Sequence, residues 1–318
     1  MSGAILVSEA VAEAAADRLR EVAPSRPVRV LEDQHAPGSL DAVEVAYFSG
    51  DLFPDRTRAL AKALHLVPQL RWFHSFSAGV DHPWFQRMLA QGVRVTTSSG
   101  AAAVPIAQTA LLYMLALSRD LPGWQRDQAA RRWNPRDIED LTGQRLLVVG
   151  LGPIGLELAR LAAGLGMEVS GLRRTPRGDE PCETWPLERL DELLPRTDWL
   201  ALALPLVPET THLIDARRLA LLPRTARVLN VGRGALIDEQ ALAAALEAGR
   251  LAGAGLDVFE EEPLPEASAL WSHPNVIVTP HSAGTSPGNA LRATEIFLDN
   301  LARYECGESL RNEVGAPR

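Results

Sequence analysis

The chain has 318 residues, a formal net charge of −8 with neutral histidines, 46% hydrophobic residues and 23% charged residues. This length fits two domains, and the composition is that of a packed globular protein, which argues against a disordered or collagen-like chain. An acidic chain without a run rich in lysine and arginine lacks the positive field that phosphate-rich partners require. We therefore expect neither a nucleic-acid nor a membrane partner.

Two cysteines, Cys182 and Cys306, are too few for a disulfide framework or a four-ligand zinc site. The first residues show no basic segment followed by a long apolar run, and no run of about 20 apolar residues occurs, so we expect a cytoplasmic protein. Six histidines have no metal-ligand spacing and are predicted to be surface or packing residues, and no metal site is expected. These six are His35, His65, His74, His82, His212 and His273.

Short apolar runs alternate along the chain with Ala/Leu-rich segments at helical spacing, a rhythm typical of parallel sheets covered by helices. The first group of predicted strands is 4–7, 28–31, 45–48, 72–75 and 94–97. The second group is 145–149, 168–172, 199–204, 227–231, 253–256 and 276–279. So many strands exceed one small sheet and indicate an α/β protein with two domains.

The two groups of strands separate near residue 100, where the loop Ser98-Ser99-Gly100 precedes an apolar helix predicted at 104–117. A second long helix, predicted at 287–303, follows the last strand and can return the chain to the first domain. The sequence therefore predicts a discontinuous domain of residues 1–100 and 285–318 and a continuous one of residues 101–284.

The strongest local pattern is the turn Gly150-Leu151-Gly152-Pro153-Ile154-Gly155, between the strand predicted at 145–149 and an amphipathic helical pattern. In such a turn, Gly150 permits the tight bend and Gly152 lets backbone amides approach a pyrophosphate. Gly155 lets the helix pack on the strand, and the start of the helix supplies partial positive charge. The sequence predicts a dinucleotide-binding domain, with a glycine-rich structural turn as the simpler alternative.

The residues after the next strand bear on which dinucleotide binds. An NAD-binding unit usually places an Asp or Glu there for the ribose hydroxyls, but this chain has Arg173, Arg174 and Thr175. Glu168, the nearest acid upstream, lies at the wrong end of the strand. Two guanidinium groups and a hydroxyl suit a 2′-phosphate, so we predict NADP(H). NAD(H) remains the alternative, in which these arginines extend into solvent.

Three further segments, 230–234, 255–263 and 278–284, each lie just beyond a predicted strand and supply one cation, one carboxylate and one imidazole. Because the carboxyl ends of parallel strands line the ligand crevice, we expect these side chains to converge. Hydride transfer to a carbonyl beside a carboxylate needs such a set. The arginine holds the acid, the histidine supplies a proton, and the glutamate keeps the histidine protonated and oriented.

Together these segments resemble the D-isomer-specific 2-hydroxyacid dehydrogenases, near the glyoxylate/hydroxypyruvate reductase-like members. The resemblance covers nearly the whole chain and includes residues 77–82, 205–210, 230–259, 263–265 and 270–281. It implies two Rossmann-like doubly wound parallel-sheet domains with the active site in the cleft between them. It also implies that the enzyme reduces a small 2-oxo acid to the (R)-2-hydroxy acid, and a homodimer is expected.

The resemblance implies roles for individual residues. The family's catalytic residues fall on Arg233, Glu262 and His281, and its contact to the nicotinamide carboxamide falls on Asp257. Arg233 is expected to hold the substrate carboxylate as well. The backbone amides of the loop Ala78-Gly79-Val80 are expected to bind the same carboxylate, although without the resemblance this loop reads as an ordinary turn.

Several interpretations stay open at this point. Trp133 could cover a neighbouring subunit's active site, as in related reductases, or could pack structurally, and Phe53 could shape the substrate pocket. The pair Glu260-Glu261 reads most simply as a solvated acidic turn. The substrate could be a larger branched oxo acid. A non-enzymatic nucleotide-sensing scaffold of the corepressor kind is the alternative from another functional class.

Overall fold

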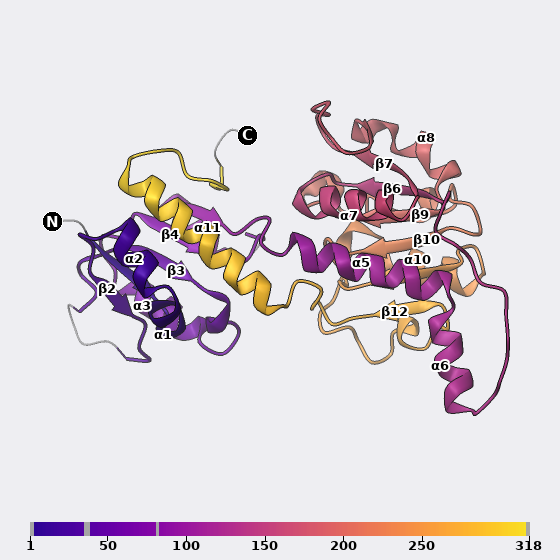
Figure 1. Ribbon diagram of the computed structural model, residues 1–318, viewed down its shortest axis with the longest axis horizontal. Helices are drawn as coiled ribbons and strands as arrows, with labels where there is room; N and C mark the ends of the chain where they lie inside the picture. The colour runs from indigo at the N-terminus through magenta and orange to yellow at the C-terminus, as the bar shows by residue number, and fades with distance from the viewer. Residues whose placement is uncertain (1–2, 35–38, 81–82, 316–318) are drawn as a thin grey trace. The chain divides into compact units, whose positions relative to one another are not determined.

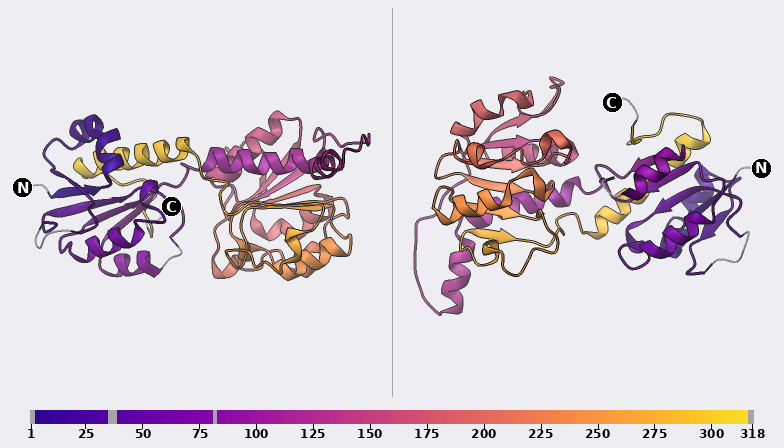
Figure 2. Two further views of the ribbon diagram at one scale, coloured as in Figure 1. Left: turned by 90° about the horizontal axis from the view of Figure 1, so that it is seen from below. Right: turned by 180° about the vertical axis from the view of Figure 1, so that it is seen from behind.

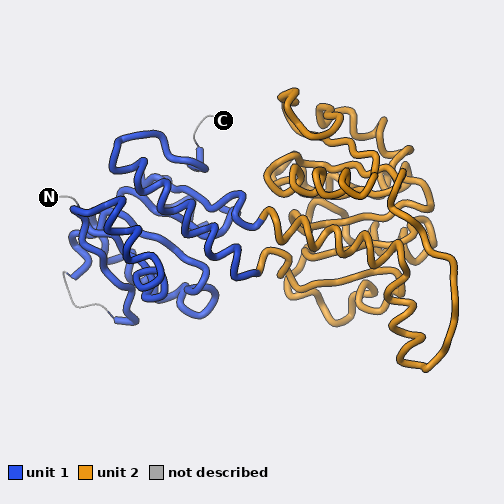
Figure 3. The backbone as a smooth tube through the Cα atoms, viewed as in Figure 1, with its two compact units in different colours: residues 1–102, 286–318 blue, residues 103–285 orange. Residues whose placement is uncertain are grey.

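The computed structural model describes residues 3–34, 39–80 and 83–315, which form two units, each built around a parallel sheet (Figure 1). Unit 1 draws on residues 1–102 and 286–318, and unit 2 is residues 103–285 (Figure 3). The chain therefore passes between the units twice. No helix within the described residues is long and apolar enough to span a membrane.

The sheet of unit 1 has the strand order β2-β1-β3-β4-β5 within the described residues, and every pair is parallel. The strands are β1 (Ala4–Val7), β2 (Val28–Val30), β3 (Val43–Phe48), β4 (Trp72–Ser75) and β5 (Arg94–Thr97). All four residues of β1 are buried, as expected for a strand covered by helices on both faces.

Helices cover both faces of this sheet (Figure 2). They are α1 (Glu9–Ala14), α2 (Ala16–Val22), α3 (Thr57–His65), α4 (Pro83–Ala90) and α11 (Pro287–Glu305). Side chains of α3 and α4 pack on the face that contains Leu6, whereas those of α1, α2 and α11 pack on the face that contains Ile5. Phe297 of α11 stacks on Tyr47 with ring centroids 4.4 Å apart. The last helix thus completes the core of unit 1.

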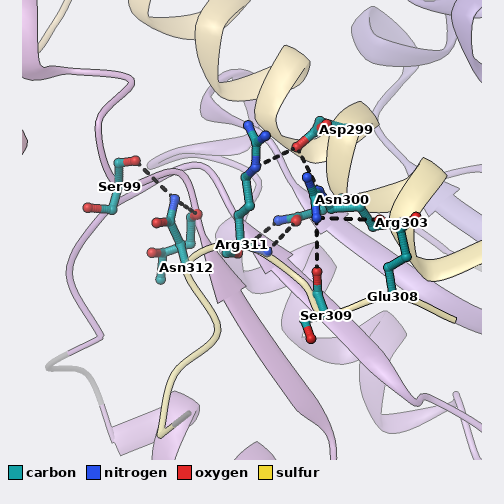
Figure 4. Close-up of polar contacts among 9 residues, drawn as sticks. Ser99, Asp299, Asn300, Arg303, Glu308, Ser309, Arg311 and Asn312 are labelled. Atoms are coloured by element: carbon teal, nitrogen blue, oxygen red, sulfur yellow. Dashed lines mark hydrogen bonds and ion pairs between the residues drawn. The ribbon is translucent and has the colours of Figure 1, made fainter. Parts of the chain in front are cut away.

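The segment after α11 is fixed to unit 1 by polar contacts (Figure 4). The buried Asn300 side chain donates to the Arg311 carbonyl at 3.0 Å and accepts from the Arg311 amide at 2.7 Å. Asn312 donates to the Ser99 carbonyl at 3.0 Å, and Glu313 forms an antiparallel bridge with the edge strand β5. The end of the described chain therefore lies against the last strand of the sheet.

The sheet of unit 2 has the strand order β12-β11-β10-β9-β6-β7-β8 in the described part of the chain, all parallel. Its strands are β6 (Arg145–Val149), β7 (Glu168–Leu172), β8 (Glu183–Trp185), β9 (Trp199–Leu202), β10 (Arg227–Asn230), β11 (Gly253–Leu256) and β12 (Val276–Val278). The order reverses between β6 and β9, and ligands bind at the strand carboxyl ends beside such a switch point in doubly wound sheets.

Two layers of helices cover the sheet of unit 2. The α-helices of this unit are α5 (Ala103–Ser118), α6 (Leu121–Ala129), α7 (Pro153–Gly164), α8 (Leu190–Leu193), α9 (Ala216–Leu219) and α10 (Glu239–Glu247). Helices α5 and α7 share a buried cluster with Leu146 and Val148, and α8, α9 and α10 share one with Leu147 and Val149. Unit 2 also has the short 3-10 helices η2 (Leu187–Arg189), η3 (Leu194–Arg196), η4 (Pro208–Thr210), η5 (Gly234–Leu236) and η6 (Ala269–Trp271), and unit 1 has η1 (Gly50–Leu52).

The predicted α/β class with two doubly wound parallel sheets is confirmed. Four predicted strands, at 28–31, 199–204, 227–231 and 276–279, end one or two residues early. For β9 the physical reason is visible, since Leu204 lies against Gly150 and the chain has already left the sheet there. The short strand β8 was not predicted, because three residues show no periodicity.

Candidate active site

The glycine turn after β6 has the geometry that its sequence predicts. Gly150 has φ of +102°, a conformation that L side chains rarely adopt, and its amide donates to the Leu172 carbonyl at 2.8 Å. A Cβ at Gly155 would lie 2.0 Å from the Gly150 carbonyl oxygen. Both glycines are therefore required by the protein's own packing, because they let α7 begin directly against the turn.

Gly152 differs from its neighbours, because a Cβ at this position would meet no atom of the described chain within 4 Å. It is the N-cap residue of the 12-residue helix α7, and Pro153 and Ile154 form the first helical positions. A helix start with backbone amides open to its surroundings is a ready anion site. The turn therefore fits the pyrophosphate of a dinucleotide, because the space that a side chain at residue 152 would fill is open to the phosphate groups.

A pocket of about 400 Å³ lies beside this helix start, and its lining includes Pro153, Arg173, Arg177 and Glu180. Arg173 is not an isolated cation there. Its Nη1 lies 2.8 Å from Oε1 of Glu180, and the two side chains are only 17% and 2% exposed. A guanidinium has further N–H groups, so one ion pair leaves donors for a phosphate.

Glu180 is a member of this pocket that the sequence reasoning missed. Its carboxylate accepts the backbone amides of Arg177 and Gly178, each at 2.8 Å, in addition to Arg173. These bonds, that from the Arg177 amide foremost, lower the pKa of Glu180 to about 2. Its sequence position among other polar residues gave no signal, since only the folded turn brings the donors together. Arg174 and Thr175, the other predicted phosphate contacts, are exposed.

Arg233 follows β10 in a turn that a buried asparagine holds. The Asn230 side chain donates to the Arg233 carbonyl at 2.9 Å and accepts from the Gly232 amide at 3.1 Å. A Cβ at Gly234 would lie 1.8 Å from the Phe259 carbonyl carbon, so this turn lies directly against the loop that precedes Glu262. The glycine at 234 thus brings two of the predicted catalytic segments together.

His281 and Glu262 are in direct contact. His281 Nδ1 lies 2.7 Å from Glu262 Oε2, and Glu262 Oε1 accepts the Phe259 amide at 3.0 Å. A carboxylate only accepts hydrogen bonds, so Nδ1 carries a proton and Nε2 is the ring nitrogen left for a substrate. The His281 side chain is 50% exposed, which leaves it accessible.

Asp257, at the carboxyl end of β11, binds the loop that carries His281. The residue is 3% exposed, its Oδ1 accepts the Ser282 amide at 3.0 Å and its Oδ2 accepts the Ala283 amide at 3.1 Å. The His281 amide donates to the Asp257 carbonyl at 2.8 Å. The family resemblance implies a cofactor contact for Asp257, which stays a prediction, and the sequence did not indicate this role in holding the loop.

Comparison with known proteins decides the family. Residues 111–283 match the family model described as "D-isomer specific 2-hydroxyacid dehydrogenase, NAD binding domain". The chain is 34% identical over 266 residues to the glyoxylate reductase of Korarchaeum cryptofilum, a match that covers 80% of this chain and 79% of that protein. The chain belongs to the D-isomer-specific 2-hydroxyacid dehydrogenases.

Solved structures agree with this membership. A D-isomer specific 2-hydroxyacid dehydrogenase from Xanthobacter autotrophicus Py2, in complex with NADPH and MES, has a TM-score of 0.80 and 34% identity, covering 99% of this chain and 98% of its own. An NADPH-dependent glyoxylate/hydroxypyruvate reductase from Sinorhizobium meliloti, with NADP and sulfate, has a TM-score of 0.78 and 28% identity, with coverages of 99% and 98%. The present dehydrogenase is accordingly an NAD(P)-dependent oxidoreductase.

The predicted substrate loop of the dehydrogenase belongs to unit 1. It follows β4, with Ala78 exposed and Gly79 and Val80 half-buried. The Ser77 hydroxyl donates to the Gly79 carbonyl at 3.0 Å, and the Ser77 carbonyl accepts the Ser98 amide at 3.3 Å. These bonds shape the loop, and its contact with substrate stays a prediction. The adjoining residues 81 and 82 of the resembling segment lie outside the described residues.

Other histidines of the dehydrogenase have clear surroundings. His74 is fully buried, with ring nitrogens 2.6 Å from Thr96 Oγ1 and 2.9 Å from Ser98 Oγ, and burial lowers its pKa to about 3. His65 and His273 are not buried. His35 and His82 lie outside the described residues. Within the described ranges, no group of three or more His, Cys, Asp or Glu side chains could hold a metal ion.

The acidic turn before Glu262 is exposed at Glu260 and Glu261, as predicted, and Glu260 also makes polar contacts that the sequence did not indicate. Glu260 Oε1 lies 2.9 Å from His212 Nε2 and accepts the Glu239 amide at 3.0 Å. The Glu260 amide in turn donates to Glu239 Oε2 at 3.1 Å. These two hydrogen bonds hold the loop before Glu262 against the start of α10. Glu261 is exposed, as predicted.

The side chains of Trp133 and Phe53 are largely exposed to solvent. Trp133 is 95% exposed, so the interpretation that it packs within its own chain is wrong, and the cover over a partner's active site stays a prediction. Phe53 is 61% exposed and lies 6.0 Å from Phe76 between ring centroids. A contact between Phe53 and substrate also stays a prediction.

Proposed function

We propose that this dehydrogenase reduces a small 2-oxo acid, of the glyoxylate or hydroxypyruvate kind, to the (R)-2-hydroxy acid with NADPH. The observation that carries the proposal is the contact of 2.7 Å between Glu262 and His281 Nδ1, which leaves Nε2 of an accessible imidazole for the substrate. Relatives named glyoxylate reductase support the substrate class.

Each residue has a role that follows from its chemistry. When bound, NADPH supplies the hydride for the carbonyl carbon. His281 donates its Nε2 proton to the carbonyl oxygen, and Glu262 holds Nδ1 and stabilises the positive ring. Arg233 binds the substrate carboxylate and polarises the ketone, because its planar fork matches the geometry of a carboxylate. The Gly79 and Val80 backbone amides are proposed to bind the same carboxylate.

We propose NADPH over NADH because of the segment Arg173-Arg174-Thr175 after β7, with Arg177 in the same pocket. The relatives solved with NADPH or NADP support this preference. The ion pair between Arg173 and Glu180 holds the guanidinium in the pocket. NADH remains the alternative. It would be favoured if the negative charge of Glu180 fully neutralised Arg173, because the pocket would then attract a 2′-phosphate less strongly.

Replacement of His281 by Ala tests the proposal. We expect kcat with glyoxylate and hydroxypyruvate to fall by about 10²–10⁴-fold, the usual contribution of general acid catalysis, with little change in the affinity for NADPH. A panel that adds pyruvate and branched and aromatic oxo acids, with both cofactors, measures substrate and cofactor preference. Near-normal turnover of His281→Ala would refute the mechanism, and no turnover by wild-type protein that binds nucleotide would favour the scaffold alternative.

We also propose a homodimer and a cytoplasmic location. The fully exposed Trp133 indole and the part-exposed Trp124 ring on α6 support a self-association surface. The free thiols Cys182 and Cys306 are compatible with a reducing compartment. Sedimentation of the purified protein measures the first proposal directly.

A further inference from the structure

A buried tyrosine on α5 contacts the threonine that precedes the His281 loop. Tyr113 is fully buried in unit 2, and its hydroxyl is hydrogen-bonded to Thr279 Oγ1. Thr279 Oγ1 in turn donates to Asp257 Oδ1 at 2.5 Å. Because a threonine hydroxyl has one proton and a carboxylate only accepts, the direction is fixed. Tyr113 donates to Thr279, and Thr279 donates to Asp257.

The sheet is shaped to admit this tyrosine. Gly255 lies in β11 two residues before Asp257, and a Cβ there would lie 2.6 Å from Tyr113 ring atoms. Any larger residue at 255 would displace the ring. Burial is also the main cause that raises the pKa of Tyr113 to about 12, so the hydroxyl keeps its proton at physiological pH.

Beyond Asp257, the chain of bonds reaches the residues on both sides of His281. Asp257 accepts the amides of Ser282 and Ala283 with its carboxylate and the His281 amide with its carbonyl oxygen. His281 itself has φ of +48°, a left-handed conformation that is uncommon for residues other than glycine. The Asp257 contacts hold the backbone on both sides of His281 in this conformation.

We propose that Tyr113 is a positioning residue for His281, acting through Thr279 and Asp257. The proposal rests on the proposed role of His281 in proton donation. Without the tyrosine hydroxyl, Thr279 Oγ1 loses its donor in a part-buried site. A chain of hydrogen bonds shielded from water weakens as a whole when one member is removed. The loop then varies in position, and misplacement of an acid by a fraction of an ångström slows proton transfer.

The test is Tyr113→Phe, with Tyr47→Phe as the matched control. Tyr47 is a buried tyrosine in unit 1 whose hydroxyl lies 3.4 Å from Thr294 Oγ1 and which has no hydrogen bond to Thr279 or Asp257 among those of the described residues. We expect Tyr113→Phe to lower kcat about tenfold at an unchanged dissociation constant for NADPH. Amide hydrogen exchange over residues 279–285 should become faster. Tyr47→Phe should leave kcat and exchange over 279–285 as in wild type.

Substitutions at Thr279 give a second, independent readout. Thr279→Val removes the hydroxyl at nearly constant shape and should reproduce the loss in kcat, whereas Thr279→Ser keeps the hydroxyl and should restore most of it. The double variant Tyr113→Phe/Thr279→Val should lose no more than either single variant, since both act through one chain of bonds.

The outcomes that overturn the inference are distinct from those that refute the proposed function. Wild-type kcat and exchange in Tyr113→Phe would overturn the positioning role. If Tyr113→Phe does not fold, equal kcat in Thr279→Val and wild type overturns it instead. If His281→Ala is fully active, the proposed function fails. The exchange of the 279–285 amides then still decides whether Tyr113 holds the loop.

Discussion

Glu262 is proposed to orient the His281 ring and to stabilise its protonated form, and one substitution separates these two roles. Glu262→Gln keeps an oxygen that can accept from His281 Nδ1 but removes the negative charge opposite the imidazolium. We expect kcat to fall about 10²-fold with NADPH affinity unchanged, because charge stabilisation of the protonated ring is lost. Steady-state kinetics and a fluorescence titration with NADPH measure the two quantities. A fall in NADPH affinity alone would contradict the assignment.

Arg173 and Arg174 are predicted to set the cofactor preference. A charge-assisted hydrogen bond to the 2′-phosphate is worth roughly 1.5–3 kcal/mol, so Arg173→Ala/Arg174→Ala should raise the KM for NADPH at least about tenfold and leave that for NADH unchanged. Arg145→Ala is the control, since Arg145 pairs with Asp198 at the opposite end of β6. An unchanged KM for NADPH in the double variant would show that neither arginine contacts the 2′-phosphate.

At the scale of single residues, strand position in a parallel sheet predicted where an arginine, a carboxylate and a histidine would converge, and the family resemblance pointed to Arg233, Glu262 and His281. The structure places Glu262 and His281 in contact, and the catalytic roles stay predictions. Glu180 and Tyr113 could not be named. An acid in a polar loop and a tyrosine in an apolar helix look like surface and core residues, and only the fold shows which atoms they meet.

At the scale of elements, the turn between β6 and α7 contains one glycine that packing within the protein requires and another that leaves space for the cofactor. Gly155→Ala would place its Cβ 2.0 Å from a carbonyl oxygen and should lower the melting temperature, whereas Gly152→Ala meets no described protein atom. We expect Gly152→Ala to keep the wild-type melting temperature but to bind NADPH at least about tenfold more weakly, since a methyl group enters the pyrophosphate site. Thermal unfolding with and without NADPH measures both. Equal destabilisation of the two variants would contradict this reading.

Strand β4 contains a histidine that makes the stability of unit 1 depend on pH. The pKa of His74 is about 3 in the fold, below the ordinary value of 6.5, because burial disfavours the charged ring. Between these values the unfolded chain binds more protons. Stability from this group is therefore complete above pH 6.5 and falls as the pH drops toward 3, by up to about 1.4 kcal/mol per pH unit.

Urea unfolding at pH 7, 6 and 5 measures this dependence, with His74→Gln as the reference that cannot titrate at this position. Wild type should lose more stability than His74→Gln over the interval, and the difference between the two isolates His74 from the carboxylates. Parallel pH profiles would show that His74 is not the group responsible. The replacement itself is expected to destabilise the fold, because two buried hydroxyls, of Thr96 and Ser98, lose their partner.

The whole molecule was predictable in class because short, mostly apolar strands alternate with helical segments, a rhythm that leaves few alternatives to parallel sheets covered by helices. The predicted helix at 287–303 corresponds to α11, which packs in unit 1 through Phe297. What the rhythm cannot show is how irregular segments fold. The antiparallel bridge of Glu313 to β5 is one example, since no periodicity marks a single bridging residue.

That bridge has a consequence for how the protein can be handled. An uncovered edge of a sheet is a template for pairing between molecules, and here residues 312–314 cover β5 through bonds such as that from the Val314 amide to the Val95 carbonyl at 2.8 Å. Removal of residues 310–318 would expose this edge together with the apolar Leu310 site, so that variant should aggregate at concentrations where a chain shortened only by residues 316–318 stays monodisperse in light scattering. Purification tags and fusion partners are therefore better placed on a linker after residue 315 than in exchange for the residues before it.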